Sequence, residues 1–147
     1  MSQVTYRELY APSHFGNSYE VMAPYEMKEV LEEAKHWGFN AYGDWFDSAD
    51  LKHPANNPKN EFLAPQAIWD RKKIFYGLAH RVGLKTSLIL TPNHVFLDQL
   101  DSDLLAEMNS ERIIGQLLCP SKPRARQVIL DNCRWMFREL ADAGVPL

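Results

Sequence analysis

The chain has 147 residues, with 16 Lys and Arg against 19 Asp and Glu, which gives a formal net charge of −3. Hydrophobic residues make up 46% and charged residues 24%, a globular composition that excludes a disordered tail or a fibrous repeat. This charge balance lacks the excess of Lys and Arg that a nucleic-acid-binding surface needs. No apolar run approaches the roughly 18 residues of a membrane span, and the first residues lack a signal-peptide pattern. We therefore expect a cytoplasmic protein without nucleic-acid or membrane partners, although a chain trimmed of its leader would look the same.

A unit made of a helix, a glycine and an apolar strand recurs along the chain. It occupies residues 34–42 and 79–87, and a third copy begins at residues 141–147. Each copy has a glycine where a helix needs a left-handed C-cap residue, a conformation that glycine adopts without steric cost. The apolar residues that follow suit a buried strand. The three glycines are Gly38, Gly83 and Gly144.

Hydrophobic periodicity predicts three amphipathic helices, beginning near Pro24, near Pro65 and after residues 121–123. Proline suits the first turn of a helix, and Glu26 complements the positive end of the first one. Each helix is expected to bury one apolar face. These faces hold Met27, Val30, Leu31 and Ala34; Ile68, Phe75, Leu78, Ala79 and Val82; and Ile129, Cys133, Met136, Phe137 and Leu140.

Strands are predicted at residues 39–46 and 84–90, with an earlier one within residues 5–15. Residues 117–119 form a brief apolar piece that suits a strand end or a packed loop. Strands that alternate with long helices predict βαβ units and a parallel sheet. Right-handed crossovers would place the helices on one side of the sheet in a barrel, or on both sides in an open doubly wound sheet.

Two long loops interrupt the repeat, at residues 48–60 and 92–116, and the second holds a candidate short helix at residues 102–109. Both loops follow the carboxyl ends of predicted strands, where α/β barrels and open sheets build their binding sites. Loops of this length in a compact domain are usually functional or disordered.

The extent of the repeat determines the expected fold class. A complete eight-stranded barrel needs roughly 250 residues. This chain holds three helix–strand units and the start of a fourth, whose strand would begin at or after Val145. We therefore expect an α/β fold, a partial TIM-type barrel of about three to four βα units with a parallel sheet. Residues 1–147 would form a single, incomplete domain, either the N-terminal part of a larger barrel or a half-barrel with a partner.

Polar and aromatic side chains gather where the predicted strands end. Asp44 and Trp45 end one strand, and Asn93 and His94 follow the next. Carboxylates accept hydrogen bonds from sugar hydroxyls, indole rings stack on apolar sugar faces, and an imidazole can move protons. These four residues are the predicted substrate-binding site for a carbohydrate. The alternatives are that Trp45 fills the core and that Asn93 and His94 form only a solvated turn.

Other polar groups carry weaker signals. Asp47 suits a solvated loop as well as a site, and His14 and Asn17 would lie at the mouth of the earliest strand. A basic cluster at the start of the third helix is typical of a solvated face, although a phosphate could dock there. The cluster consists of Lys122, Arg124 and Arg126.

The sequence contains no strong motif for a metal or a cofactor. The histidines have no metal-ligand spacing, so no metal site is predicted. Cys119 and Cys133 form no disulfide framework and suit small buried hydrophobes. No nucleophile elbow, P-loop or dinucleotide fingerprint occurs, so no cofactor is expected.

From about residue 19 to residue 147 the chain resembles the (β/α)8-barrel glycoside hydrolases. The resemblance lies in the helix end at residues 34–40, the aromatic and acidic strand end after it, and the strand at residues 87–93. It continues through the Cys-Pro-Ser-Lys-Pro stretch of residues 119–123, followed by Arg126 and the Ile-Leu-Asp-Asn stretch of residues 129–132. It is moderately specific for the superfamily and does not determine the individual family.

The resemblance implies hydrolysis of a glycosidic bond by two carboxylates in the parent protein. These lie about 5–5.5 Å apart for retention, or about 6.5–9.5 Å for inversion. In such hydrolases the acid/base residue sits at the end of the fourth strand, which implies a catalytic pair beyond Leu147. The chain alone would then bind carbohydrate without being a competent glycosidase.

Two rival interpretations remain. One is a non-catalytic half-barrel that binds sugar or self-associates through its open sheet edges, since such edges invite pairing. The other is a different barrel enzyme, such as an isomerase or aldolase that acts on a small sugar.

Overall fold

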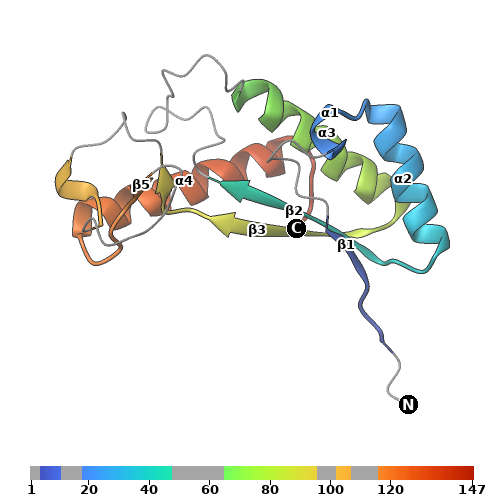
Figure 1. The fold of residues 1–147 in the computed structure, drawn as a ribbon, viewed down its shortest axis with the longest axis horizontal. Helices are drawn as coiled ribbons and strands as arrows, with labels where there is room; N and C mark the ends of the chain where they lie inside the picture. The colour runs from blue at the N-terminus through green and yellow to red at the C-terminus, as the bar shows by residue number, and fades with distance from the viewer. Residues whose placement is uncertain (1–3, 11–17, 48–64, 96–101, 107–115) are drawn as a thin grey trace. The chain divides into compact units, whose positions relative to one another are not determined.

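The computed structural model describes residues 4–10, 18–47, 65–95, 102–106 and 116–147 (Figure 1). The chain divides into two compact units, and each is described by itself. The first comprises Met1–Trp45, Asp70–Ile89 and Leu140–Leu147, and the second Phe46–Trp69 and Leu90–Glu139. The predicted loop at residues 48–60, together with His14 and Asn17, lies outside the described residues.

The first unit contains a three-stranded sheet in the order β1-β2-β3. Its strands are β1 (Glu8–Tyr10), β2 (Ala41–Asp47) and β3 (Lys85–Thr91). β1 pairs with β2 in parallel, with Glu8 opposite Ala41 and Tyr10 opposite Gly43. The predicted α/β class and parallel sheet are confirmed.

The long helices are α2 (Pro24–His36), α3 (Pro65–Val82) and α4 (Pro123–Asp142), and a short α1 (Ser18–Val21) precedes them. All three predicted helices are therefore confirmed. Each long helix begins at a proline, whose missing N–H would have no partner in the first turn anyway. Glu26 also reaches back to accept a 2.6 Å hydrogen bond from the Ala23 N–H, which caps α2.

The three helix ends have the same geometry, which explains the repeat in the sequence. Gly38, Gly83 and Gly144 have φ angles of 84°, 85° and 69°. The residue after each glycine donates its N–H to the carbonyl five residues earlier, as in Phe39 to Ala34 at 3.0 Å. This is the Schellman motif, which needs the left-handed residue that glycine supplies.

The core of the first unit lies between the sheet and the helices α2 and α3, which Figure 1 shows on the same side of the strands. Right-handed crossovers between neighbouring parallel strands produce this arrangement. Buried side chains on α2 and α3 pack there with Tyr42 of β2. They are Met27, Leu31, Ala34, Phe75, Tyr76, Leu78 and Ala79.

The second unit contains a small antiparallel ladder in which β4 (His94–Val95) pairs with β5 (Gln116–Leu117). The predicted helix at residues 102–109 is a 3₁₀ turn, η3 (Ser102–Leu104), as far as the structure describes it. A small core of Leu104, Leu118 and Ala125 joins these segments to the start of α4. No helix among the described residues is long and apolar enough to cross a membrane.

Candidate functional site

Successive residues of β2 face opposite sides of the sheet, as the pleat requires. Tyr42 and Asp44 face α3, since the Tyr42 ring contacts Tyr76 and the Asp44 carboxylate pairs with Lys72. Gly43 lies between them, and a Cβ atom at this position would point to the other face of the sheet. The polar groups around β2 therefore form two clusters, one on each face.

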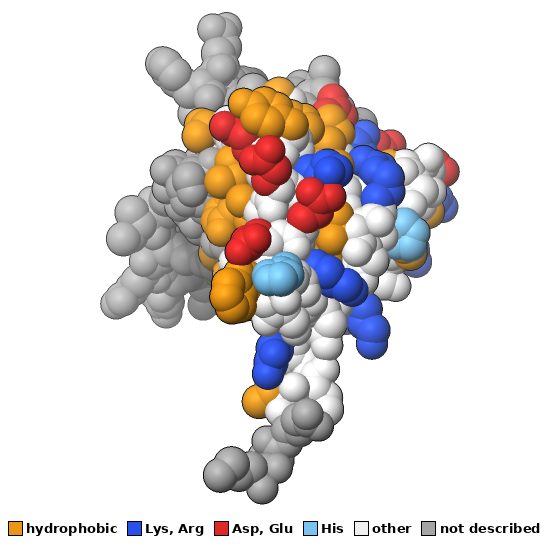
Figure 2. All heavy atoms as spheres, turned by 90° about the vertical axis from the view of Figure 1, so that its right-hand side faces the viewer, with side chains coloured by type: hydrophobic (Ala, Val, Ile, Leu, Met, Phe, Trp, Pro, Cys, Tyr) orange, Lys and Arg blue, Asp and Glu red, His pale blue; other side chains and the backbone are white. Residues whose placement is uncertain are grey.

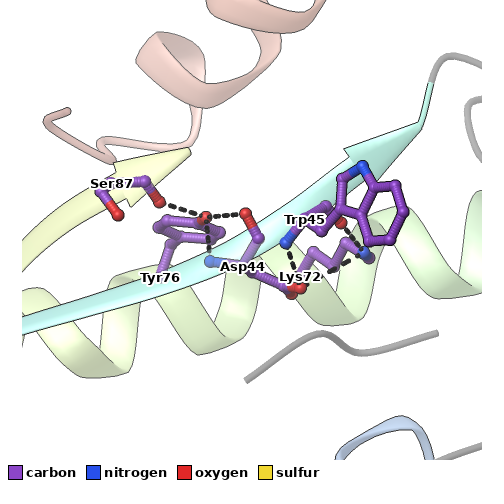
Figure 3. Close-up of polar contacts among 5 residues, drawn as sticks. All are labelled: Asp44, Trp45, Lys72, Tyr76 and Ser87. Atoms are coloured by element: carbon purple, nitrogen blue, oxygen red, sulfur yellow. Dashed lines mark hydrogen bonds and ion pairs between the residues drawn. The ribbon is translucent and has the colours of Figure 1, made fainter. Parts of the chain in front are cut away.

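The cluster on the helix side is built around an ion pair. The side chains of Asp44 and Lys72 are 0% and 1% exposed, and Lys72 Nζ lies 3.6 Å from Asp44 Oδ1. Lys72 Nζ also donates a 2.6 Å hydrogen bond to the Trp45 carbonyl, while the Trp45 N–H donates to Asp44 Oδ1 at 2.7 Å. Figure 3 shows the carboxylate and the ammonium group pointing toward each other. The two side chains of the pair therefore bind the carbonyl and the N–H of Trp45, near the end of β2.

The Tyr76 hydroxyl joins two strands from the same side. It accepts a 3.1 Å hydrogen bond from the Asp44 N–H and donates at 2.6 Å to the Ser87 carbonyl of β3 (Figure 3). Burial, followed by the nearby Asp44 carboxylate, raises the pKa of Tyr76 above its ordinary value. Tyr76 therefore stays a neutral donor and acceptor between β2 and β3.

Tyr42 lies against Tyr76 but makes no comparable link. The two rings meet edge to face with centroids 5.3 Å apart. The buried Tyr42 hydroxyl has no hydrogen-bond partner in the described part of the chain. Burial, with a further contribution from Asp44, raises the pKa of Tyr42 well above its usual value.

Replacing Tyr76 with Phe is expected to lower the free energy of unfolding by about 1–3 kcal/mol, because it removes the hydroxyl that bonds the buried Asp44 N–H and the half-buried Ser87 carbonyl. Tyr42→Phe removes a hydroxyl that makes no bond, so it should be neutral or slightly stabilising. Urea unfolding of the two variants measures the difference. Equal losses would contradict the assigned hydrogen bonds.

The cluster on the opposite face centres on Glu8 of β1. Its Oε1 accepts a 2.6 Å hydrogen bond from the Ser87 hydroxyl of β3, and its Oε2 accepts one of 2.6 Å from the Tyr6 hydroxyl. Glu8 and Ser87 meet over Gly43, where a Cβ atom would overlap Glu8 Oε1. The hydrogen bond to Glu8 is the largest cause of the raised pKa of Tyr6. Glu8 and Ser87 are half-buried, so this carboxylate is within reach of a ligand.

Of the four predicted site residues, the structure describes Asp44 and Trp45 in the first unit and Asn93 and His94 in the second. Asp44 is fully buried and Trp45 is half-buried. The Asn93 carbonyl accepts a 2.8 Å hydrogen bond from the Leu118 N–H, and His94 begins β4. The four-residue binding site stays a prediction.

The sequence analysis missed Glu8, Ser87, Lys72 and Tyr76. The sequence did contain one indication of this cluster. A glycine inside a strand often marks a place where another group approaches the backbone closely, and the Glu8 carboxylate lies over Gly43. Lys72 and Tyr76 stand four residues apart, one turn of α3, which places them on the same helix face. Nothing local indicates which strand they meet.

A surface hollow of about 460 Å³ lies between α2 and α3. Two of the cations that line it have partners: Lys28 pairs with Glu32 at 2.7 Å, and Lys35 Nζ donates at 2.7 Å to the Gly83 carbonyl. Figure 2 shows basic and acidic side chains interspersed on the face it views. The structure gives no reason to assign this hollow to an anion.

The described residues also contain no group of three or more His, Cys, Asp or Glu able to hold a metal ion.

Comparison with known proteins found no matching family model, no similar curated protein and no similar solved structure.

Proposed function

We propose that this chain is the carbohydrate-binding, N-terminal portion of a glycoside-hydrolase-like (β/α) barrel. The main support is the order in which the chain visits its strands. β1, β2 and β3 lie in sequential order, and the segment after α4 returns to the start of β3, where the Thr86 hydroxyl donates to the Pro146 carbonyl. A barrel adds its fourth strand beside the third, whereas a doubly wound sheet of order 3-2-1-4 adds it beside the first.

The Glu8–Ser87 hydrogen bond supports the same proposal. β1 and β3 flank β2, so in a flat sheet they lie roughly 9.6 Å apart, twice the usual strand spacing. A glutamate and a serine can meet over that distance at 2.6 Å because Gly43 of β2 has no side chain between them. In a barrel, side chains of alternate strands form common layers on the concave inner face. Glu8 and Ser87 match such a layer.

The chemistry of this face favours a sugar. The half-buried Glu8 carboxylate accepts hydroxyl hydrogen bonds, and Tyr10, 42% exposed, ends β1 beside Gly43. Trp45 follows Asp44 and so lies on the same face as Gly43 by strand alternation. A carboxylate and aromatic residues on one face of a sheet suit the polar edges and apolar faces of a pyranose.

In this proposal the Trp45 indole stacks on the sugar. Asp44 and Lys72 support it from behind the sheet, since both bind the Trp45 backbone. Asn93 and His94 remain predicted hydroxyl-binding residues.

Replacing Trp45 with Ala should weaken binding of neutral disaccharides by about fivefold, because a stacked ring contributes on the order of 1 kcal/mol. Titration calorimetry with cellobiose, maltose and lactose measures this. Trp37→Ala is the matched control: Trp37 is 67% exposed after α2, at the opposite end of β2, and its loss should leave binding unchanged.

His94→Ala is expected to weaken the same binding without unfolding the protein. Absence of binding by the unaltered chain to all three disaccharides would refute the proposed function. Loss of the thermal transition in Trp45→Ala would instead identify Trp45 as a core residue.

A further inference from the structure

We propose that Glu8 is the hydroxyl acceptor of a sugar subsite that binds neutral and amine-bearing sugars and rejects anionic ones. This inference rests on the proposed function and adds the chemical class of the ligand. It follows from three features of the sheet face that carries Glu8 and Ser87: the remaining acceptor capacity of Glu8, its position over Gly43, and the local charge.

Two hydrogen bonds fix the orientation of the Glu8 carboxylate but leave some of its acceptor positions unused. Ser87 and Tyr6 each donate one hydrogen bond, one to each oxygen, at 2.6 Å. An ionised carboxylate offers about four acceptor positions, so two remain for a ligand. Ser87 and Tyr6 hold the carboxylate in one orientation before a ligand arrives, which lowers the entropy cost of binding.

Gly43 provides the space in which this carboxylate lies. A Cβ atom there would overlap Glu8 Oε1 and lie 2.6 Å from Ser87 Oγ. Both atoms belong to side chains rather than backbone, and Gly43 is not among the glycines with positive φ. Alanine at position 43 is therefore compatible with the strand but not with the position of Glu8.

The acidic group at this face is the Glu8 carboxylate, and Lys85, two residues before Ser87 on β3, lies on the same face by strand alternation. Among the residues that the structure describes, Glu8 has hydroxyl partners and forms no ion pair. The neighbouring carboxylate, Asp44, faces the other side of the sheet, where Lys72 compensates it. An anionic sugar at Glu8 would meet a like charge, which opposes binding, whereas an amine would gain a charge-assisted hydrogen bond.

The test measures binding of methyl glycosides of glucose and galactose, and of the matching amino sugars and uronic acids, to the full chain by saturation-transfer NMR. The unaltered chain should bind the neutral and amino sugars at least about tenfold more tightly than the uronic acids. Glu8→Gln should reduce this preference to about threefold or less, because it removes the charge but keeps the shape. Gly43→Ala should weaken neutral-sugar binding by about tenfold.

Glu29→Gln, which removes an exposed carboxylate from α2, is the matched control and should change nothing. If Gly43→Ala fails to fold, Ser87→Ala takes its place, with a smaller loss expected. If sugars bind but Glu8→Gln retains the full preference, this inference is wrong and the proposed function stands. If no sugar binds the unaltered chain, both are wrong.

Discussion

Replacing Asp44 with Ala is expected to lower the free energy of unfolding by about 3–5 kcal/mol, because it removes the buried carboxylate that pairs with the Lys72 ammonium group. Lys72 has 1% of its side chain exposed, so water cannot replace the lost carboxylate. The Trp45 N–H also loses its 2.7 Å acceptor. Chemical denaturation with guanidinium chloride measures the loss.

Two control variants distinguish the effect of breaking a buried ion pair from the effect of breaking any ion pair. Glu32→Ala breaks an ion pair with Lys28 in which both side chains are about half exposed, and it should cost only about 0.3–0.5 kcal/mol. The double variant Asp44→Leu with Lys72→Met removes both charges and should recover most of the stability, because apolar residues of similar volume often replace a buried pair without loss. A loss for Asp44→Ala no larger than for Glu32→Ala would show that Lys72 is solvated.

The second large effect is a loss of folding stability at alkaline pH. Burial raises the pKa of both Tyr42 and Tyr76 above the ordinary tyrosine value of 10.0. Above pH 10 the unfolded chain releases these two protons while the folded chain retains them, so stability is complete below pH 10 and is lost as the pH rises. Each tyrosine contributes a slope of about 1.4 kcal/mol per pH unit, so the two together remove about 3 kcal/mol by pH 11.

The measurement is urea unfolding at pH 9, 10 and 11, with tyrosinate absorbance recorded at each pH. Tyr42→Phe, which keeps the ring and removes one titrating hydroxyl, should reduce the decline above pH 10 by about half. A decline of the same size in Tyr42→Phe would mean that Tyr42 ionises in the folded protein.

The sequence predicted the helices and strands well because their signals are local. The helix starts depend on Pro24, Pro65 and Pro123, and the helix ends on a glycine and a hydrogen bond that spans five residues. The strand at residues 39–46 was predicted within two residues of β2 at either end. A period of two or of 3.6 residues is visible in any short stretch of chain.

The candidate site was less predictable because its partners are far apart in sequence. Asp44 is a predicted substrate-binding residue, but the face on which it lies depends on the strand register, and a shift of one residue would reverse it. The antiparallel ladder of β4 and β5 was also missed, since two residues per strand carry no periodic pattern.

The sequence by itself determined the α/β class, the three long helices and the glycines that end them, because each depends on interactions within a few residues. Only the tertiary structure decided that Asp44 pairs with Lys72 behind the sheet, and that Glu8 meets Ser87 in front of it. Glu8 and Ser87 are 79 positions apart and become neighbours only when β1 and β3 align on either side of β2. That alignment comes from burying the apolar faces of α2 and α3 on a common sheet, which no local pattern contains.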